Sequence, residues 1–329
     1  MQSNVGNEIK ITLHEPWMKQ QVVDSFCKQY GNSVEQFSEF FSKFYDNDFQ
    51  KGNSLRLVAI LGDVVAGFAS FCKWPYKVYG KEINSLQCGN VIISENFRGK
   101  GLYNKMLDYL NEHHSRFKID LIIGFPIKEI LKLYLKSQWK NPFNISWYIS
   151  VTNIFSVLFP VNKKKMESLF LTEPKYQINS PYSNKIELVK TKEFFTWHKS
   201  YNFIFDYYFF RIEHENEYIE FTLKINYREK FIKELIIGDI TTNSHSIDFI
   251  KNAFKKLQKA AFKTGFISFI SIAINDLDKN ALIFKVISNL KFKKIEKDIK
   301  FIYRNFNADE NLLSNPTNWV LYRRDLDTW

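Results

Sequence analysis

The chain has 329 residues, of which 45% are hydrophobic and 17% aromatic, and its formal net charge is +11. This composition excludes a disordered or fibrous chain, because it supplies enough apolar surface for large cores, and the length suits about two domains. Three cysteines without paired spacing, Cys27, Cys72 and Cys88, predict neither a disulfide scaffold nor a metal site. We find no signal peptide and no apolar run long enough to span a bilayer, and we expect a soluble, cytosolic protein.

The positive charge is consistent with three kinds of partner: nucleic acid, an anionic membrane surface or phosphorylated small molecules. The basic residues are spread along the chain, and the densest run is Lys163-Lys164-Lys165. Because no nucleic-acid-binding signature accompanies them, we expect no nucleic acid partner. A basic solvated surface without any partner explains the charge equally well, so the charge alone does not identify the function.

The first half alternates strand and helix patterns. Gly62-Asp63 separates two apolar runs and predicts a hairpin turn, and Pro16 suits the first turn of a helix. The expected strands are 9–13, 55–60, 64–71, 86–94 and 119–125, and the expected helices are 16–29, 34–44, 102–113 and 127–137.

The second half repeats part of this order. Residues 161–190 are rich in Lys, Asn, Ser and Pro and are predicted to form a linker. After it we expect strands at 221–226, 234–240 and 266–274, a helix from 247 capped by Ser246, and a helix at 279–288 capped by Asp278. The strand–helix–strand–helix order of residues 91–139 thus recurs in residues 235–292, which predicts an internal duplication. The predicted domains are residues 1–160 and 191–329.

The segment Val91–Leu107 is the most informative in the chain. An apolar strand enters a turn with Arg98, Gly99, Lys100 and Gly101, and an amphipathic helix leaves it. Such a turn leaves backbone N–H groups free beside the positive end of a helix dipole, which suits an anion such as a pyrophosphate. It is neither a P-loop nor a complete dinucleotide fingerprint. An ordinary strand-to-helix turn with two glycines is the simpler alternative.

This segment resembles the coenzyme A signature of GNAT acyltransferases, Arg/Gln-x-x-Gly-x-Gly/Ala. Arg98 and Gly101 match the signature, whereas Tyr103 replaces the usual Gly or Ala. The resemblance implies that acyl-CoA is the co-substrate, without a metal. The residues that it assigns to coenzyme A are Ile92, Ile93, Ser94, Arg98, Gly99, Lys100, Gly101, Leu102, Tyr103 and Asn104.

A second match lies further along the chain. Tyr134-Leu135-Lys136-Ser137-Gln138-Trp139 resembles the family pattern Tyr-x-Lys-x-Gly-Phe, with Gln138 and Trp139 as departures. In many relatives this tyrosine protonates the departing thiolate, so the resemblance makes Tyr134 the candidate general acid. A core tyrosine on an apolar helix face is the alternative.

The resemblance implies an α+β fold with mixed sheets and two tandem GNAT-like domains. The second lacks the Gly-containing turn, since Ile240 is followed by Thr241-Thr242-Asn243-Ser244-His245. The arrangement is similar to that of enzymes that acylate nucleotide-linked amino sugars for bacterial surface polysaccharides such as O-antigen. It implies transfer of an acetyl or 3-hydroxybutanoyl group to an acceptor such as a dTDP-3-amino-3,6-dideoxyhexose.

Direct transfer also needs a base for the amine proton, or water leading to one. The candidate bases are His14, Glu82, His198, Asp206 and Asp239, with His14 and Asp239 foremost. The candidate acceptor ligands are Arg211, Asp325 and Asp327. Cys88 fits a buried thiol better than a nucleophile. Two further functions remain open, a tRNA-dependent aminoacyl transferase and a non-catalytic acyl-CoA sensor.

Overall fold

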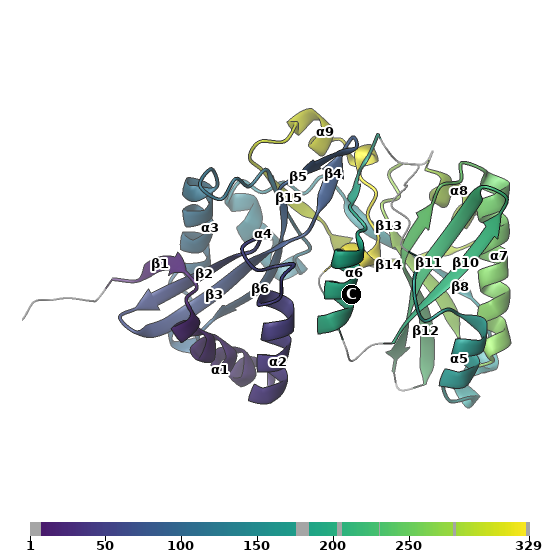
Figure 1. The fold of residues 1–329 in the computed structure, drawn as a ribbon, viewed down its shortest axis with the longest axis horizontal. Helices are drawn as coiled ribbons and strands as arrows, with labels where there is room; N and C mark the ends of the chain where they lie inside the picture. Colours follow the sequence, from purple (N-terminus) through teal and green to yellow (C-terminus); the bar gives the residue numbers. More distant parts are fainter. Residues whose placement is uncertain (1–7, 176–183, 203–205, 230, 279–280, 327–329) are drawn as a thin grey trace, which may run out of the picture.

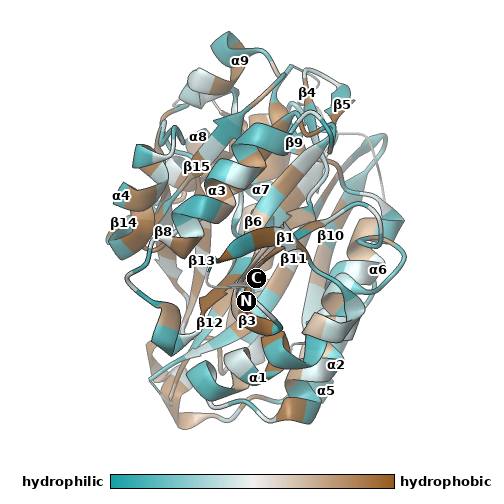
Figure 2. Cartoon of the chain, turned by 90° about the vertical axis from the view of Figure 1, so that its left-hand side faces the viewer, coloured by the Kyte–Doolittle hydropathy of each residue, from teal (hydrophilic) through white to brown (hydrophobic). Residues whose placement is uncertain are grey.

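The computed structural model describes residues 8–175, 184–202, 206–229, 231–278 and 281–326. Two six-stranded sheets stand side by side, and α6 (Lys192–Tyr201) lies between them (Figure 1). In Figure 2 the strands of the first sheet are largely hydrophobic, whereas the helices in front of them carry hydrophilic stretches, as expected for amphipathic helices that cover a sheet. No helix among the described residues is both long and apolar enough to cross a membrane.

The first sheet holds all five strands predicted in the first half. Its order is β1 (Lys10–Leu13), β2 (Leu55–Leu61), β3 (Val64–Lys73), β6 (Ser85–Ile93), β7 (Leu121–Gly124) and β15 (Ile302–Asn305). All neighbours are antiparallel except β6 and β7. The helices of this half are α1 (Lys19–Tyr30), α2 (Val34–Tyr45), α3 (Leu102–His113) and α4 (Lys128–Lys136), and the short helices η1 (Pro16–Met18) and η2 (Glu95–Phe97) precede α1 and α3.

The second sheet has the same plan around another parallel pair, β12 and β13. Its order is β10 (Tyr207–His214), β11 (Glu217–Arg228), β12 (Ile232–Thr242), β13 (Phe269–Ile274), β8 (Asn144–Val151) and β14 (Lys293–Lys300). Its helices are α5 (Lys163–Leu169), α7 (Ile247–Thr264) and α8 (Leu282–Asn289). The succession β6–α3–β7–α4 is therefore repeated as β12–α7–β13–α8, and the predicted tandem α+β fold is confirmed.

The remaining elements join the two halves. A small sheet contains β5 (Lys81–Ile83), β4 (Tyr76–Val78) and β9 (Ile186–Leu188), and the short helices are η3 (Ile154–Leu158), α9 (Glu310–Ser314), η4 (Pro316–Asn318) and η5 (Arg323–Asp325). The predicted linker 161–190 thus contains α5 and β9 among its described residues, and β9 pairs with β4 of the first half.

The two sheets exchange strands. β8, which lies inside the predicted first domain 1–160, sits between β13 and β14, and β15 from the predicted second domain 191–329 pairs with β7. The sheets therefore do not follow those residue ranges. One hydrophobic core runs through both halves and contains Phe44, Trp74, Trp197 and Trp319. The exchanged strands and this shared core join the two halves.

Helix starts test the local predictions. Ser246 caps α7 as predicted, by accepting a hydrogen bond from Phe249 N at 3.2 Å. The prediction for Asp278 is wrong, because α8 begins at Leu282 with Ala281 as its N-cap. The Asp278 carboxylate instead forms an ion pair with Lys185 Nζ at 3.1 Å.

Candidate active site

An opening between β6 and β7 defines the candidate site. The two parallel strands pair only from Ser85 with Leu121 to Gln87 with Ile123, and β6 then continues without β7. A bulge at Gly89-Asn90, opposite Ser70 of β3, accompanies the separation. A bulge bends a strand and increases its twist, so it directs the rest of β6 away from β7. The predicted cofactor residues Ile92, Ile93 and Ser94 lie on this separated part.

The turn after β6 presents backbone donors. Gly99 and Gly101 have φ angles of 74° and 68°, a conformation that favours glycine, and Gly101 is the N-cap of α3. No described side chain caps α3, and the first N–H groups of a helix lack partners within the helix. A Cβ atom on either glycine would meet no heavy atom within 4 Å in the described chain, so the space above the turn is open. This geometry suits a phosphate group.

The other predicted turn residues frame this space. Arg98 folds back: its Nε donates to Ile93 O at 3.2 Å and its guanidinium bonds Gln29 of α1. Lys100 Nζ lies 5.1 Å from the centre of the Phe97 ring. Leu102 is buried and anchors the helix, whereas Asn104 is exposed. The two basic side chains add positive potential next to the N–H groups.

Two phenols and a thiol meet where β6 leaves β7. Tyr134 OH lies 2.6 Å from Tyr103 OH and 3.0 Å from Cys88 Sγ, and Tyr103 OH lies 3.3 Å from the same sulfur. The pKa of Tyr103 is raised well above its ordinary value, first by burial and then by Cys88 and Tyr134, so its hydroxyl keeps its proton at neutral pH. The Tyr134 ring is held edge-on to Trp139 at 5.0 Å. The cluster thus holds phenol hydroxyl groups in the opening, where one can act as a proton donor.

A cavity of about 590 Å³ lies beside Asn90 and Val91 of β6, on the sheet face covered by α1 and α2. Its lining is mainly aromatic and includes Phe26, Tyr30, Phe37, Phe40, Asn90 and Tyr201. Asn90 belongs to the bulge, and its Nδ2 donates to Tyr45 OH at 2.9 Å. Cys88 and Asn90 are two residues apart, so the phenol cluster and the cavity flank the same stretch of the separated strand.

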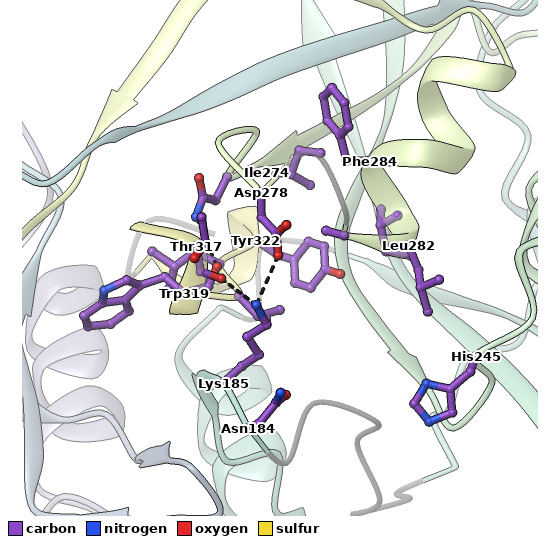
Figure 3. Close-up of a pocket in the computed structure, with 15 residues that line it drawn as sticks. Asn184, Lys185, His245, Ile274, Asp278, Leu282, Phe284, Thr317, Trp319 and Tyr322 are labelled. Atoms are coloured by element: carbon purple, nitrogen blue, oxygen red, sulfur yellow. Dashed lines mark hydrogen bonds and ion pairs between the residues drawn. The ribbon is translucent and has the colours of Figure 1, made fainter. Parts of the chain in front are cut away.

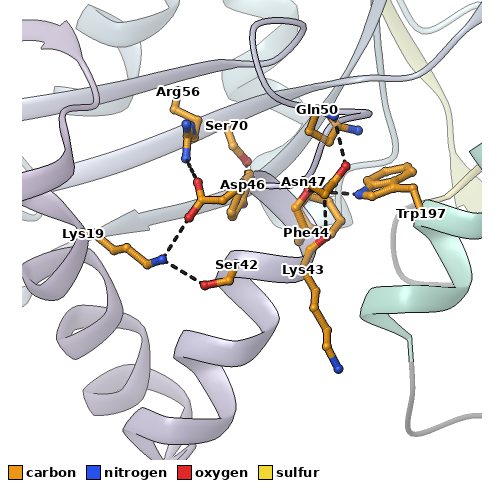
Figure 4. Close-up of polar contacts among 11 residues, drawn as sticks. Lys19, Ser42, Lys43, Phe44, Asp46, Asn47, Gln50, Arg56, Ser70 and Trp197 are labelled. Carbon is orange, nitrogen blue, oxygen red and sulfur yellow. Dashed lines mark hydrogen bonds and ion pairs between the residues drawn. The ribbon is translucent and has the colours of Figure 1, made fainter. Parts of the chain in front are cut away.

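Polar contacts fix the helix that forms one wall of this cavity (Figure 4). Asp46, directly after α2, forms ion pairs with Lys19 of α1 and with Arg56 of β2, each at 2.9 Å. Trp197 of α6 donates from Nε1 to Phe44 O at 3.0 Å. The second half therefore contributes α6, with Tyr201, to a wall that the first half holds in place.

The predicted base His14 lies away from the phenol cluster. Its ring is 5.6 Å from Phe41 and 6.1 Å from Phe68, both in the core on the α1–α2 face. Tyr134 belongs to the core on the opposite face. Burial, and next the charge of Arg56, lower the pKa of His14 to about 4. The structure thus does not bring His14 and Tyr134 together.

The other predicted acceptor ligands and bases are scattered. Arg211 is paired with Glu213 and with Glu220, the latter at 3.4 Å, while Asp327 lies outside the described residues. Of the remaining candidates, Glu82 lies on β5, His198 is buried in α6 with a lowered pKa, and Asp206 pairs with Lys163.

Asp239 and Asp325 interact electrostatically in the second half. Asp239 is buried in β12 and forms an ion pair with Lys190 at 2.7 Å. Asp325 accepts hydrogen bonds from Tyr76 OH and from Tyr322 N. Burial is the main cause that raises the pKa of Asp325 to about 7, and the charge of Asp239 also raises it.

The second half has an equivalent opening, but it is filled. β12 and β13 pair only from Glu234 with Phe269 to Ile237 with Ile272. Beyond that point Tyr322 forms a β-bridge with Ile274, and η5 contacts both strands. Beside this segment, a cavity of about 710 Å³ contains Lys185, which donates to Asp278 and, at 2.7 Å, to Thr317 O (Figure 3).

Strand pairing reveals a correspondence that our sequence analysis missed. Gly238-Asp239 forms a bulge in β12, as Gly89-Asn90 does in β6. The signal was present, because Leu86–Ser94 and Leu235–Asn243 can be aligned without a gap with Leu, Gly and Asn/Asp at matching positions. Asp239 is therefore the counterpart of Asn90 and belongs to the second opening.

Comparisons with known proteins support the fold. No family model and no curated protein matches the chain. A GCN5-related N-acetyltransferase from Anabaena variabilis is similar in structure, with a TM-score of 0.61, 15% identity, and coverage of 91% of this chain and 73% of that one. A probable N-acyltransferase from Enterococcus faecalis has a TM-score of 0.58 and 10% identity, with coverage of 93% of this chain and 74% of that one. A GCN5-related N-acetyltransferase from Kribbella flavida has a TM-score of 0.51 and 12% identity, with coverage of 91% of this chain and 71% of that one. The chain therefore has the fold of GCN5-related N-acetyltransferases, here as a tandem of two halves.

Proposed function

We propose that the protein is an N-acyltransferase that uses acyl-CoA as donor and an amine as acceptor, with the first half as the catalytic one. One observation carries the proposal: the uncapped start of α3, the opening between β6 and β7, and the Tyr134 hydroxyl lie along one continuous stretch of chain and sheet. Together they offer sites for a pyrophosphate, an extended thioester arm and a leaving thiolate.

The reaction that we propose is direct attack. The neutral amine forms a bond to the thioester carbonyl carbon, and the C–S bond of the resulting tetrahedral intermediate then breaks. Tyr134 donates its proton to the departing thiolate, and Tyr103, 2.6 Å away, can pass a proton back to it. Neither His14 nor Asp239 lines the aromatic cavity, so we propose that water carries the amine proton away.

For the acceptor we propose a nucleotide-linked amino sugar, such as a dTDP-3-amino-3,6-dideoxyhexose, bound in the aromatic cavity. Of the aromatic side chains that line the cavity, Tyr30 is exposed and Phe40 is half-buried, and these two could pack against a base or a deoxygenated sugar ring. Arg211 and Asp325 are engaged within the protein, so we assign acceptor recognition to the cavity rather than to them.

A thiol-release assay tests the proposal. Acetyl-CoA and 3-hydroxybutanoyl-CoA are each offered with a panel of dTDP- and UDP-linked amino sugars and simple amines. We expect release that depends on one thioester and one acceptor. Release with simple amines but not with nucleotide sugars would keep the acyltransferase and remove the sugar proposal. No turnover despite acyl-CoA binding would remove both.

A second candidate, a non-catalytic acyl-CoA sensor, is favoured by Tyr103. The family signature has Gly or Ala here, whereas the Tyr103 hydroxyl reaches into the opening and bonds Tyr134 and Cys88. Binding of acyl-CoA measured by calorimetry, together with no thiol release for any acceptor, would favour the sensor.

A further inference from the structure

The segment between β8 and α5 has its hydrophobic side turned outward. Ile154, Phe155 and Leu158 have exposed fractions of 71%, 65% and 73%. The apolar patch, as we call it, consists of exposed side chains on and around η3: Val151, Ile154, Phe155, Val157, Leu158 and Phe159. Monomeric proteins rarely expose so many neighbouring large apolar side chains without a function.

Polar residues of the same segment face inward and fix this orientation. Ser156 is fully buried and its Oγ donates to Ser268 Oγ at 2.7 Å, while Asn153 Nδ2 donates to Gly265 O at 2.9 Å. The buried Lys233 donates from Nζ to Ser156 O at 3.2 Å and to Phe159 O at 2.7 Å. The hydrogen bonds thus stabilise a conformation in which the apolar side chains lie in solvent.

Neighbouring elements extend the patch. Phe231 lies two residues before Lys233, and Phe262 lies three residues before Gly265, and both are exposed. These two residues come from the β11–β12 turn and from the end of α7 and are each close in sequence to a residue that holds η3. The apolar surface therefore spans several elements at one end of the second half.

Basic residues adjoin the patch. Lys163, Lys164 and Lys165 begin α5 four residues after Phe159, and all three are exposed. α5 contacts α7, and Figure 1 shows α5 at the lower end of the second half. On α7, Lys263 is exposed next to Phe262. The nearby acids are Asp206, which is paired with Lys163, and the exposed Glu167 and Glu229. Positive charge prevails beside the apolar side chains.

We propose that this surface binds the anionic face of a lipid bilayer. Large apolar side chains flanked by lysines match an interface that offers acyl chains beneath negative headgroups. The apolar side chains would enter the headgroup region, and the lysines of α5 would remain at the anionic surface. The protein would be peripheral. This proposal does not depend on acyl transfer.

Co-sedimentation of the full chain with vesicles tests the proposal. Vesicles of phosphatidylcholine are compared with vesicles that contain about 30 mol% phosphatidylglycerol. We expect binding to the anionic vesicles that weakens with added salt. The triple variant Ile154→Ser/Phe155→Ser/Leu158→Ser should lower the partition coefficient at least about tenfold, and Lys164→Glu/Lys165→Glu should lower it roughly tenfold for anionic vesicles alone.

A matched control removes three other exposed apolar side chains, in Ile127→Ser/Ile130→Ser/Leu135→Ser around α4. This control should bind as the unchanged protein does, and circular dichroism melts show that each variant is folded. Absence of vesicle binding by the unchanged protein would overturn the proposal. So would equal losses in the patch variant and the α4 control. Loss of a dimer in the patch variant, without any vesicle binding, would assign the patch to a second copy of the chain instead.

Discussion

The two halves of the molecule share a strand bulge and differ in what lies beyond it. In the first half, β6 leads into an uncapped turn with open space above Gly99 and Gly101. In the second half, Ser246 caps the helix and the segment around Tyr322 fills the opening. The comparison shows that an opening between parallel strands and an anion-binding turn are separate features, and that the fold retains the first without the second.

The substitution with the largest expected effect disrupts the anion-binding turn, which the second half lacks. Gly101→Val would place a branched side chain in the left-handed region and in the space above the turn. Loss of two charge-assisted hydrogen bonds, each about 1.5–3 kcal/mol, would weaken acyl-CoA binding about 10³-fold, as measured by calorimetry. Gly62→Val, at φ 59° in the β2–β3 turn, is the matched control for strain. Equal losses of acyl-CoA affinity in both variants would contradict the assignment of acyl-CoA binding to this turn.

The next largest effect is expected on stability, from a substitution in the segment that fills the second opening. Arg324 of η5 is buried, with its guanidinium 3.8 Å from the centre of the Phe195 ring, and NH1 donates to Thr222 Oγ1 at 3.2 Å. Arg324→Ala should reduce the free energy of unfolding by about 3 kcal/mol, because it removes a buried charge beside Asp239. Denaturant unfolding measures this loss. The exposed Arg116→Ala, which also lies over an aromatic ring, should cost less than about 1 kcal/mol.

Acyl-CoA binding by the Arg324→Ala variant sharpens the same comparison. If the opening alone is insufficient, the variant should still bind one equivalent of acyl-CoA with unchanged affinity. A second equivalent would contradict this expectation, because it would show that the C-terminal segment alone keeps the second half from binding.

Tyr134 tests which opening carries the chemistry. Tyr134→Phe removes the proton donor but keeps the ring against Trp139. The maximal rate of thiol release should fall about 100-fold while acyl-CoA affinity is retained, since general acids typically contribute that factor or more. Tyr322→Phe, in the second opening, is the control and should leave the rate unchanged. A full rate in Tyr134→Phe would require another donor, with Tyr103 as the first to test.

Local features of this fold could be predicted from the sequence, whereas contacts between distant segments could not. The β6–turn–α3 unit and the Ser246 cap each depend on a few adjacent residues. The exchange of β8 and β15 depends on pairings between residues more than 100 positions apart, such as Ile149 with Ser271, which no local pattern specifies. The Asp278 prediction failed for the same reason, because Lys185 is its partner. The aromatic cavity likewise combines α1, α2, β6 and α6.

A pH effect is expected from the filled opening. The pKa of Asp325 is raised from 3.8 to about 7, so the folded state binds its proton more tightly than the unfolded state does. The resulting stability is fully present below about pH 4 and is lost as the pH rises through 7. As the pH rises from 5.5 to 7, the free energy of unfolding should therefore fall by about 1–2 kcal/mol less in Asp325→Asn than in the unchanged protein. Denaturant unfolding at several pH values measures this difference. Asp206→Asn, at an exposed ion pair, is the matched control.

Substitution of Cys88 has the smallest expected effect, and it distinguishes direct attack by the amine from transfer through an acylated cysteine. Its sulfur contacts both phenols, a position from which a nucleophile could act, yet direct attack assigns it no bond to the acyl group. Cys88→Ala should then change the rate of thiol release by less than about threefold and the free energy of unfolding by about 1 kcal/mol, as for other small buried truncations. Cys72→Ala, a buried thiol of β3, is the matched control. If activity disappeared in Cys88→Ala alone and mass spectrometry found an acyl group on Cys88 of the unchanged protein, transfer would proceed through a thioester on this residue. The two halves would then differ in a nucleophile as well as in a turn, since Ile237 occupies the equivalent position in β12.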